Sequence, residues 1–177
     1  MINLNYFSIT VGNVAFIIEW VDSCLGYAEE LKVNTPASTL TLTHRSGVIC
    51  QMDWDLGPSI NDYQDHELQQ KFAAFWINPS QSISIKLLKQ GSDYRHRVWG
   101  ALNNIPFGTT LTYSALANLI NSSARAVGNA CRDNPYPVII PCHRVVSVSG
   151  MGGYCGQTAG DLMTIKCKLL DYESRNI

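Results

Sequence analysis

One short segment in the C-terminal half, Ile140-Pro141-Cys142-His143-Arg144-Val145-Val146, constrains the fold of this chain more than any other. Pro141 fixes its own φ and biases the residue before it towards extended geometry, so residues 138–140 are expected to form a strand that ends in a constrained turn. Cys142 then lies at the end of a strand, with His143 and Arg144 beside it. A cysteine is nucleophilic as the thiolate, and a free thiol pKa of about 8.5 leaves little thiolate near neutrality without a nearby base or cation. The segment therefore predicts either an activated thiol or a structural pair of a small buried cysteine and a core histidine.

The charge of the chain is unevenly divided between its two halves. The net charge is −1, but residues 1–90 hold 5 Lys and Arg against 9 Asp and Glu, whereas residues 91–177 hold 8 against 5. A surface that binds a polyanion is expected in the second, net positive half, although ordinary surface variation would give the same modest difference.

Cysteine usage and the N-terminal sequence bear on the compartment. The six cysteines include no Cys-x-x-Cys pair and no histidine at metal-ligand spacing, so we expect free thiols, no metal site and no cofactor. Residues 1–20 have no basic start and no long apolar run, which predicts neither a signal peptide nor a membrane span. The expected location is the reducing cytoplasm.

The first half has the pattern of a β-rich unit. Four segments rich in Val, Ile, Thr and aromatic residues are separated by Gly or Pro, and we expect them to be short antiparallel strands: 6–20, 24–33, 38–45 and 47–54. The apolar spacing between Leu68 and Trp76 predicts a helix that ends at Asn78-Pro79, and residues 83–88 are a candidate for a further strand. The sequence Lys-Gln-Gly-Ser at 89–92 is the expected boundary between a domain of residues 1–90 and one of residues 91–177.

The second half has the punctuation of three successive helices. Ser92 or Asp93 can cap the first, which ends before residues 106–108. A second, short helix is expected over residues 113–120, and the Asn-Ser-Ser turn at 121–123 caps a third over residues 124–132. Two short helices joined by a tight polar turn form a helix-turn-helix, a unit that serves plain packing more often than DNA binding.

The expected helix over residues 124–132 has two different faces. One is small and apolar, and the other carries Arg125, Gly128, Asn129 and Arg132. A surface that combines Gly, Asn and Arg can approach a phosphate backbone closely, and it is equally consistent with a solvated face.

The end of the chain combines a glycine-rich loop with an amphipathic helix. Residues 152–156 are typical of a surface turn, but such a loop can also bring backbone N–H groups close to a ligand. Leu162, Ile165, Leu169 and Glu173 recur at helical spacing, so Glu173 extends an apolar stripe. A carboxylate in a last helical turn opposes the helix dipole and favours a cationic or imidazole partner. Without such a partner, Glu173 would be a solvated residue near a chain end.

Several ordered motifs between residues 94 and 173 resemble those of the O6-alkylguanine-DNA alkyltransferases, also called methylated-DNA-protein-cysteine methyltransferases. The motifs are Ile105-Pro106-Phe107-Gly108 with Tyr113, Arg125-Ala126-Val127-Gly128, Arg132 with Asn134-Pro135, Pro141-Cys142-His143-Arg144-Val145, and Gly153-Tyr154. Pro-Cys-His alone would be weak evidence, whereas this ordered set is specific.

The resemblance implies an α/β fold in which an N-terminal ribonuclease-H-like α/β domain with a short antiparallel sheet precedes a C-terminal helical domain with a helix-turn-helix. It implies a monomer whose partner is double-stranded DNA containing O6-alkylguanine, bound through the minor groove. Ala126 and Gly128 would permit close approach, with Asn129 and Arg132 on the same surface. Arg125 would replace the extruded nucleotide in the stack, because chemistry on a guanine edge requires the base to leave the duplex.

The implied activity is a single transfer of an alkyl group, such as methyl, from guanine O6 to Cys142, which leaves a thioether and inactivates the protein. Glu173 would orient His143, and His143 would draw the thiol proton through a water molecule. Tyr113 would help rotate the nucleotide and donate a proton to guanine N3, and Asn134 would brace the turn by hydrogen bonding.

The resemblance also implies a set of residues that bind the base and its substituent. Main-chain groups of Cys142, Val145 and Cys155 would face the guanine. Pro137, Tyr154 and Gly156 would wall the alkyl pocket, and Lys166 would lie near the site.

Departures from the family pattern and two other functions remain open. Residues 157–161, between Gly156 and the last expected helix, form a longer link than the family's usual short one, so the tolerated size of the alkyl group is left open. Asp133 places a negative charge at a position where the family commonly has a small residue. A non-catalytic lesion-binding module is one alternative, against which the presence of Cys142 argues. A cysteine hydrolase is the other, and it would need an oxyanion hole and would leave the Arg125 helix without a purpose.

Overall fold

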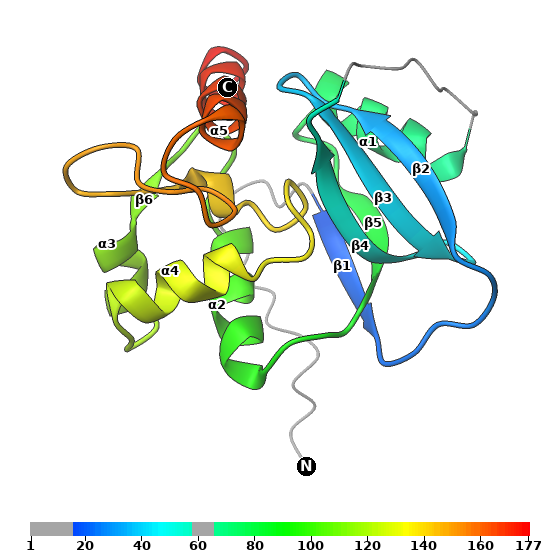
Figure 1. Cartoon of the computed structure of the whole chain (residues 1–177), viewed down its shortest axis with the longest axis horizontal. Coiled ribbons are helices and arrows are strands. Elements are labelled where there is room, and N and C mark those ends of the chain that lie inside the picture. Colours follow the sequence, from blue (N-terminus) through cyan, green and yellow to red (C-terminus); the bar gives the residue numbers. More distant parts are fainter. Residues whose placement is uncertain (1–15, 58–65) are drawn as a thin grey trace.

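The computed structural model describes residues 16–57 and 66–177, and in it a β-sheet lies beside a group of helices (Figure 1). The sheet has five strands in the order β1-β5-β4-β3-β2. Their bounds are Phe16–Val21 (β1), Glu29–Asn34 (β2), Thr39–Arg45 (β3), Val48–Asp55 (β4) and Ile83–Leu88 (β5). The fold is therefore mixed α/β, as expected.

The sheet is mixed rather than antiparallel throughout. β2 with β3 and β3 with β4 pair antiparallel, as predicted, but β1 pairs with β5 in parallel, and so does β4. The antiparallel prediction for the first strand is wrong. A helical crossover joins parallel strands, so β5, which follows β4 through the helix α1 (Glu67–Ile77), runs parallel to β4. β1 pairs along the other edge of β5 and runs in the same direction. Residues 6–15 of that predicted strand lie outside the described residues.

α1 covers one face of the sheet and closes the first part of the core (Figure 1). The ring of Phe16 on β1 packs against those of Phe72 and Phe75, with centroid distances of 5.8 and 4.6 Å. The helix begins after His66, whose Nδ1 accepts a hydrogen bond from the Leu68 amide, and it ends at Asn78, as the sequence predicts.

Four helices make up most of the second half: α2 (Asp93–Asn103), α3 (Tyr113–Leu119), α4 (Ala124–Arg132) and α5 (Asp161–Arg175). Ser92 and Ser123 cap α2 and α4, as predicted from their position before each helical segment. The short strands β6 (Leu111–Thr112) and β7 (Val145–Val146) pair in parallel and hold the start of α3 against the segment that follows Cys142. No helix among residues 16–57 and 66–177 is both long and apolar enough to cross a bilayer.

The strand predicted over residues 138–140 is absent. The segment forms a compact turn with one isolated bridge, between Pro137 and Ile140, and leads into a 3-10 helix, η1 (Cys142–Arg144). Val138 has φ +76, which is costly for a β-branched residue and is maintained only where surrounding contacts determine the backbone. Here the Ile140 amide donates to the Tyr136 carbonyl at 2.9 Å, so a local turn overrides the β preference of Val-Ile-Ile.

The sheet and the helical part are joined around this turn. The Met52 amide on β4 donates to the Pro135 carbonyl at 3.0 Å. The buried Tyr136 hydroxyl donates to the Leu88 carbonyl at 2.5 Å and accepts from the Gln90 side chain at 2.7 Å. The position of the turn therefore depends on both halves of the chain.

Candidate active site

Cys142 begins η1 and is buried at the end of the constrained turn. The Asn134 side-chain amide donates to Cys142 Sγ at 3.2 Å and to the Ile140 carbonyl at 2.8 Å. The Asn134 carbonyl oxygen accepts from the Tyr136 amide at 3.0 Å. One asparagine thus fixes the shape of the turn and orients the thiol.

His143 and Glu173 form a buried pair. His143 Nε2 lies 2.8 Å from Glu173 Oε1, and both side chains are 1% exposed. The Gly108 amide donates to Glu173 Oε2 at 3.1 Å. The helical stripe that predicted an inward Glu173 is confirmed, since Ile165, Leu169 and Glu173 are all buried on α5.

Arg144 also binds Glu173. Its place in the sequence predicted that its charge would act on the thiol, and the structure shows that its guanidinium instead contacts the carboxylate. Its Nε and Nη2 donate to the two carboxylate oxygens at 2.8 and 3.0 Å, and Nη1 donates to the Ile105 carbonyl at 2.8 Å. The carboxylate is therefore held by an imidazole, a guanidinium and a backbone amide.

These contacts set the charges of the pair. Burial opposes ionisation of Glu173, but the hydrogen bonds and charges of His143 and Arg144 outweigh it and lower the pKa to about 2. Burial lowers the pKa of His143, and the hydrogen bond to Glu173 opposes that shift only in part. A neutral imidazole whose Nε2 faces a carboxylate carries its proton there, so Nδ1 is the basic atom. Nδ1 is buried and has no hydrogen-bond partner among the described residues.

The thiol is protonated at rest. Burial raises the pKa of Cys142, while the hydrogen bond from Asn134 and the charge of Lys166 act in the opposite direction. The positive charge near the thiol therefore comes from Lys166 and not from Arg144. A thiol in this state needs a base at the moment of reaction.

Lys166 is fully buried and joins three backbone segments. Its Nζ donates to the carbonyls of Val145, Met151 and Gly153 at 2.6, 2.8 and 2.9 Å. The Val145 carbonyl, predicted to face the base, is thus engaged by Lys166.

A cavity of about 210 Å³, here called the thiol cavity, opens beside Cys142. Of the predicted residues, Tyr113, Tyr154, Cys155 and Gly156 line it with Cys142, and so do Gly128 and Arg132 of α4. Gly153, from the glycine-rich loop and the Gly153-Tyr154 motif, also lines it. Three further lining residues were not predicted as site residues: Cys131, Gln157 and Thr158.

Tyr113 lies against the loop that walls the thiol cavity. Its hydroxyl donates to the Gly153 carbonyl at 3.2 Å, and burial is the main cause that raises its pKa to about 12, so it remains a proton donor. A Cβ at Gly152, which has φ +71, would lie 2.9 Å from the Tyr113 ring. Only glycine therefore lets the loop approach this ring.

The exposed face of α4 carries Arg125, Asn129 and Arg132, while Ala126 and Gly128 are half-buried. Arg132 Nε donates to Asp133 Oδ1 at 3.2 Å, and Arg95 Nε donates to Asp133 Oδ2 at 3.2 Å. The negative charge expected from Asp133 is therefore paired with two guanidinium groups.

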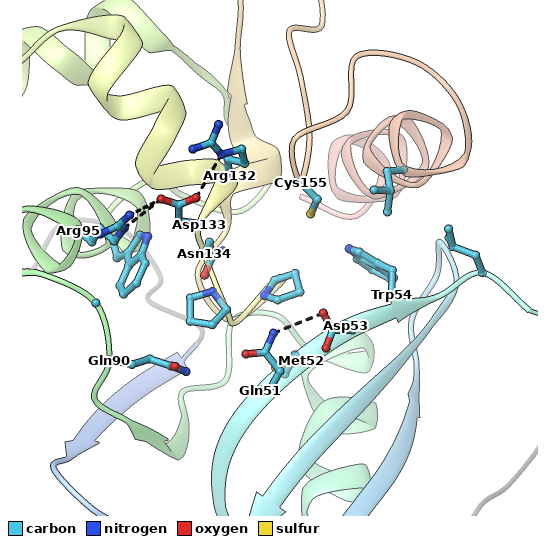
Figure 2. Close-up of a pocket in the computed structure, with 16 residues that line it drawn as sticks. Gln51, Met52, Asp53, Trp54, Gln90, Arg95, Arg132, Asp133, Asn134 and Cys155 are labelled. Carbon is cyan, nitrogen blue, oxygen red and sulfur yellow. Dashed lines mark hydrogen bonds and ion pairs between the residues drawn. The ribbon is translucent and has the colours of Figure 1, made fainter.

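Pro137 lies apart from the thiol cavity. It lines a larger cavity of about 630 Å³ between β4 and the turn, here called the sheet-side cavity, together with Asn134 and Cys155 (Figure 2). Trp54 on β4 also lines it, and its indole N–H donates to the Tyr154 hydroxyl at 3.0 Å. No local signal in the sequence could have linked Trp54 and Tyr154, which are a hundred residues apart.

The arrangement can carry out an attack by sulfur on an electrophilic carbon. The nucleophile lines a small cavity, the adjacent imidazole is held by a carboxylate, and a tyrosine with a retained proton lines the same cavity. The residues described include no group of three or more side chains that could hold a metal ion.

Comparison with known proteins identifies relatives of both halves. The family profile described as "6-O-methylguanine DNA methyltransferase, DNA binding domain" matches residues 93–175. The methylated-DNA–protein-cysteine methyltransferase of Mycolicibacterium paratuberculosis is 33% identical over 135 residues, which cover 70% of this chain and 82% of the relative. The protein of the same name from Archaeoglobus fulgidus is 34% identical over 110 residues, covering 62% and 69%.

Solved structures extend the similarity to the whole fold. The crystal structure of Mycobacterium tuberculosis O6-methylguanine methyltransferase matches with a TM-score of 0.66 at 27% identity, over 85% of this chain and 95% of that one. The Mycobacterium tuberculosis protein OGT in complex with DNA matches with a TM-score of 0.63 at 30% identity, over 81% and 91%.

Proposed function

This chain belongs to the methylated-DNA–protein-cysteine methyltransferase family, and we propose that Cys142 is the residue that accepts the alkyl group. The protein is accordingly a DNA repair enzyme that transfers a methyl group from DNA to one of its own cysteines. The observation that carries the assignment to Cys142 is that this thiol lines the thiol cavity while the adjacent His143 is bound to the buried, ionised Glu173.

The proposed reaction begins with removal of the thiol proton. Glu173 accepts a hydrogen bond from the His143 Nε2–H and stays ionised, and Nδ1 takes the thiol proton through a bridging water molecule, which leaves His143 as the imidazolium. The thiolate attacks the carbon bound to guanine O6, so a C–S bond forms as the C–O6 bond breaks and its electron pair passes to the base. Tyr113 donates a proton to guanine N3 and recovers one from the imidazolium through solvent. The thiol proton thus ends on the released guanine.

The proposed substrate is a guanine that carries an O6-alkyl group and has been turned out of a DNA duplex. The thiol cavity opens next to α4, and α3 with α4 forms the proposed helix-turn-helix, which would enter the minor groove. Arg125, exposed on α4, would occupy the place of the extruded nucleotide, with Ala126 and Gly128 against the groove. Asn129 and Arg132 would contact the DNA backbone from the same face.

The finer description of the fold is part of the proposal. The mixed sheet with its crossover helix supports a ribonuclease-H-like N-terminal domain of residues 1–90, followed by a DNA-binding and alkyltransferase domain of residues 91–177. We infer a monomer, because one chain supplies all the residues of the proposed site. Six free cysteines support a reducing compartment, the cytoplasm.

Titration with an O6-methylguanine duplex tests the proposal. Intact-mass measurement should find one added methyl group per molecule and no further reaction after one equivalent, and Cys142→Ser should gain none while still binding DNA. Continued release of product would indicate a hydrolase. Binding of the lesion without any gain in mass would indicate a recognition module, and either result would refute the assignment to Cys142.

A further inference from the structure

We propose that Arg132 is a gate between the thiol cavity and the sheet-side cavity, and that it restricts the substrate to small O6 substituents by keeping the two cavities apart. This inference rests on the proposed function, because it concerns which alkyl groups reach Cys142.

The two cavities share a wall. Arg132 and Cys155 line both the thiol cavity of about 210 Å³ and the sheet-side cavity of about 630 Å³. Sites for small molecules usually measure about 300–1,000 Å³, so the thiol cavity alone is small for an extruded guanine with a bulky substituent. The sheet-side cavity provides the missing space once the shared wall opens.

The Arg132 side chain is 57% exposed, and two contacts hold it, one at its aliphatic stem and one at Nε. Its aliphatic stem lies over Gly156, where an added Cβ would be 3.2 Å from Arg132 Cγ. Its Nε donates to Asp133 Oδ1 at 3.2 Å, and Arg95 binds Asp133 Oδ2 through Nε and Nη2. Figure 2 shows Arg95 and Arg132 both directed at Asp133, at the rim of the sheet-side cavity. Asp133 therefore connects Arg132 to α2 and keeps the gate closed.

The sheet-side cavity has a mixed lining, whose apolar part offers a surface for an aromatic substituent. The apolar side chains of this lining include two indole rings, and they are Met52, Trp54, Leu56, Trp99, Pro135, Pro137 and Leu162. Polar and charged side chains line the rest of the cavity: Gln51, Asp53, Gln90, Arg95, Arg132, Asp133 and Asn134. Trp54 is fixed by its hydrogen bond to Tyr154, which walls the thiol cavity, so a ring that passes Arg132 meets a rigid surface. Transfer of a benzyl group has the same balance as methyl transfer: the C–O6 bond breaks, a C–S bond forms at Cys142, and the thiol proton passes to guanine.

The experiment compares two substrates in the same DNA. Rates of alkyl transfer to Cys142 are measured by mass spectrometry with oligonucleotides that carry O6-methylguanine or O6-benzylguanine, for the wild type, Asp133→Asn and Arg132→Ala. The ratio of the benzyl rate to the methyl rate cancels any common loss of DNA affinity. Glu67→Gln is the control, because it removes an exposed carboxylate that pairs with Lys71 on α1.

We expect the benzyl-to-methyl ratio to rise about tenfold or more in both gate variants and to stay unchanged in the control, since a few atoms of steric fit alter rates by that order. An unchanged ratio in both variants, or a wild type that already reacts equally with both substrates, would overturn the gate while leaving the proposed function intact. Absence of methyl transfer in the wild type would instead overturn the proposed function.

Discussion

At the scale of single residues, the site depends on how Glu173 divides its hydrogen bonds. Oε1 faces His143 Nε2 and accepts from Arg144 Nη2, while Oε2 accepts from Arg144 Nε and from the Gly108 amide. The carboxylate stays ionised although it is buried, and it raises the basicity of an imidazole whose pKa burial lowers. Burial raises the pKa of the nearby Cys142 thiol, which favours its protonated form.

Glu173→Gln tests this arrangement. Gln keeps the shape but removes the charge that makes His143 basic, so His143 draws the thiol proton less readily. The apparent thiol pKa, read as the midpoint of the pH–rate profile, should therefore rise, and the alkylation rate at neutral pH should fall about a hundredfold. DNA affinity should remain unchanged, because Glu173 is buried. Asp171→Asn, an exposed change on the same helix, should behave like the wild type. A Glu173→Gln profile that superimposes on the wild-type profile would remove Glu173 from the proton path.

The identity of these site residues could be predicted from the sequence, but their contacts with one another could not. Cys142, His143, Asn134 and Glu173 follow from the motifs and from helical spacing, whereas the contact of Arg144 with Glu173 requires the fold that brings η1 against α5. The prediction that Arg144 is the cation beside the thiol is wrong for that reason. Lys166 takes that place from the far end of the chain.

At the scale of elements, α5 carries both the carboxylate and the lysine that fix the two sides of the site. Lys166 binds the carbonyls of Val145, Met151 and Gly153, and so ties β7 to the loop that walls the thiol cavity. The loop approaches Tyr113 through Gly152 and turns at Cys155 and Gly156, which both have positive φ. Its composition predicted a turn, but not the buried cation that orders it.

Lys166→Met should loosen this loop. Met has a similar length but no donor, so three carbonyl groups lose a partner and the free energy of unfolding should fall by about 3 kcal/mol. The thiol pKa should rise further, because the charge of Lys166 lowers it. Chemical unfolding and the pH–rate profile measure the two effects, with the exposed Lys168→Met as control. Equal stability of Lys166→Met and Lys168→Met would contradict the structural role.

The α4 surface makes a separate prediction. Arg125→Ala should slow repair of a duplex about tenfold or more, while its reaction with a free O6-substituted guanine base should match the wild type, because only the duplex requires extrusion. Lys71→Ala, which removes a positive charge from α1, should affect neither reaction. Equal losses of Arg125→Ala on both substrates would refute the role of Arg125 in extrusion.

At the scale of the whole molecule, the two halves meet at the turn that carries the thiol. Long-range contacts such as Met52 with Pro135 and Trp54 with Tyr154 set the position of the site, and neither leaves a periodic signal in the sequence. Helices and their caps were predictable because they depend on neighbouring residues. The parallel pairing of β1 with β5 and the left-handed Val138 were not, because both depend on contacts formed only in the folded chain.

Acid stability is a property of the whole fold that follows from Glu173. Its folded pKa of about 2 lies below the usual 4.5, so the unfolded chain binds the proton more readily. The resulting stability, on the order of 3 kcal/mol, is fully present above about pH 4.5 and is lost as the pH falls towards 2. Urea unfolding between pH 7 and pH 3 should show this loss in the wild type and a weaker pH dependence in Glu173→Gln. Identical pH dependence in the two proteins would contradict it.

The most direct test of the central claim is to locate the transferred group among the six thiols. After reaction with an O6-methylguanine duplex, the protein is digested and the mass of each cysteine-containing peptide is measured. We expect one methyl group on the peptide of Cys142 and none on the others, including the peptide of Cys155, which lines the same cavity but whose pKa is raised by burial to about 12. A methyl group on any other cysteine, or an unmodified Cys142, would contradict the central claim.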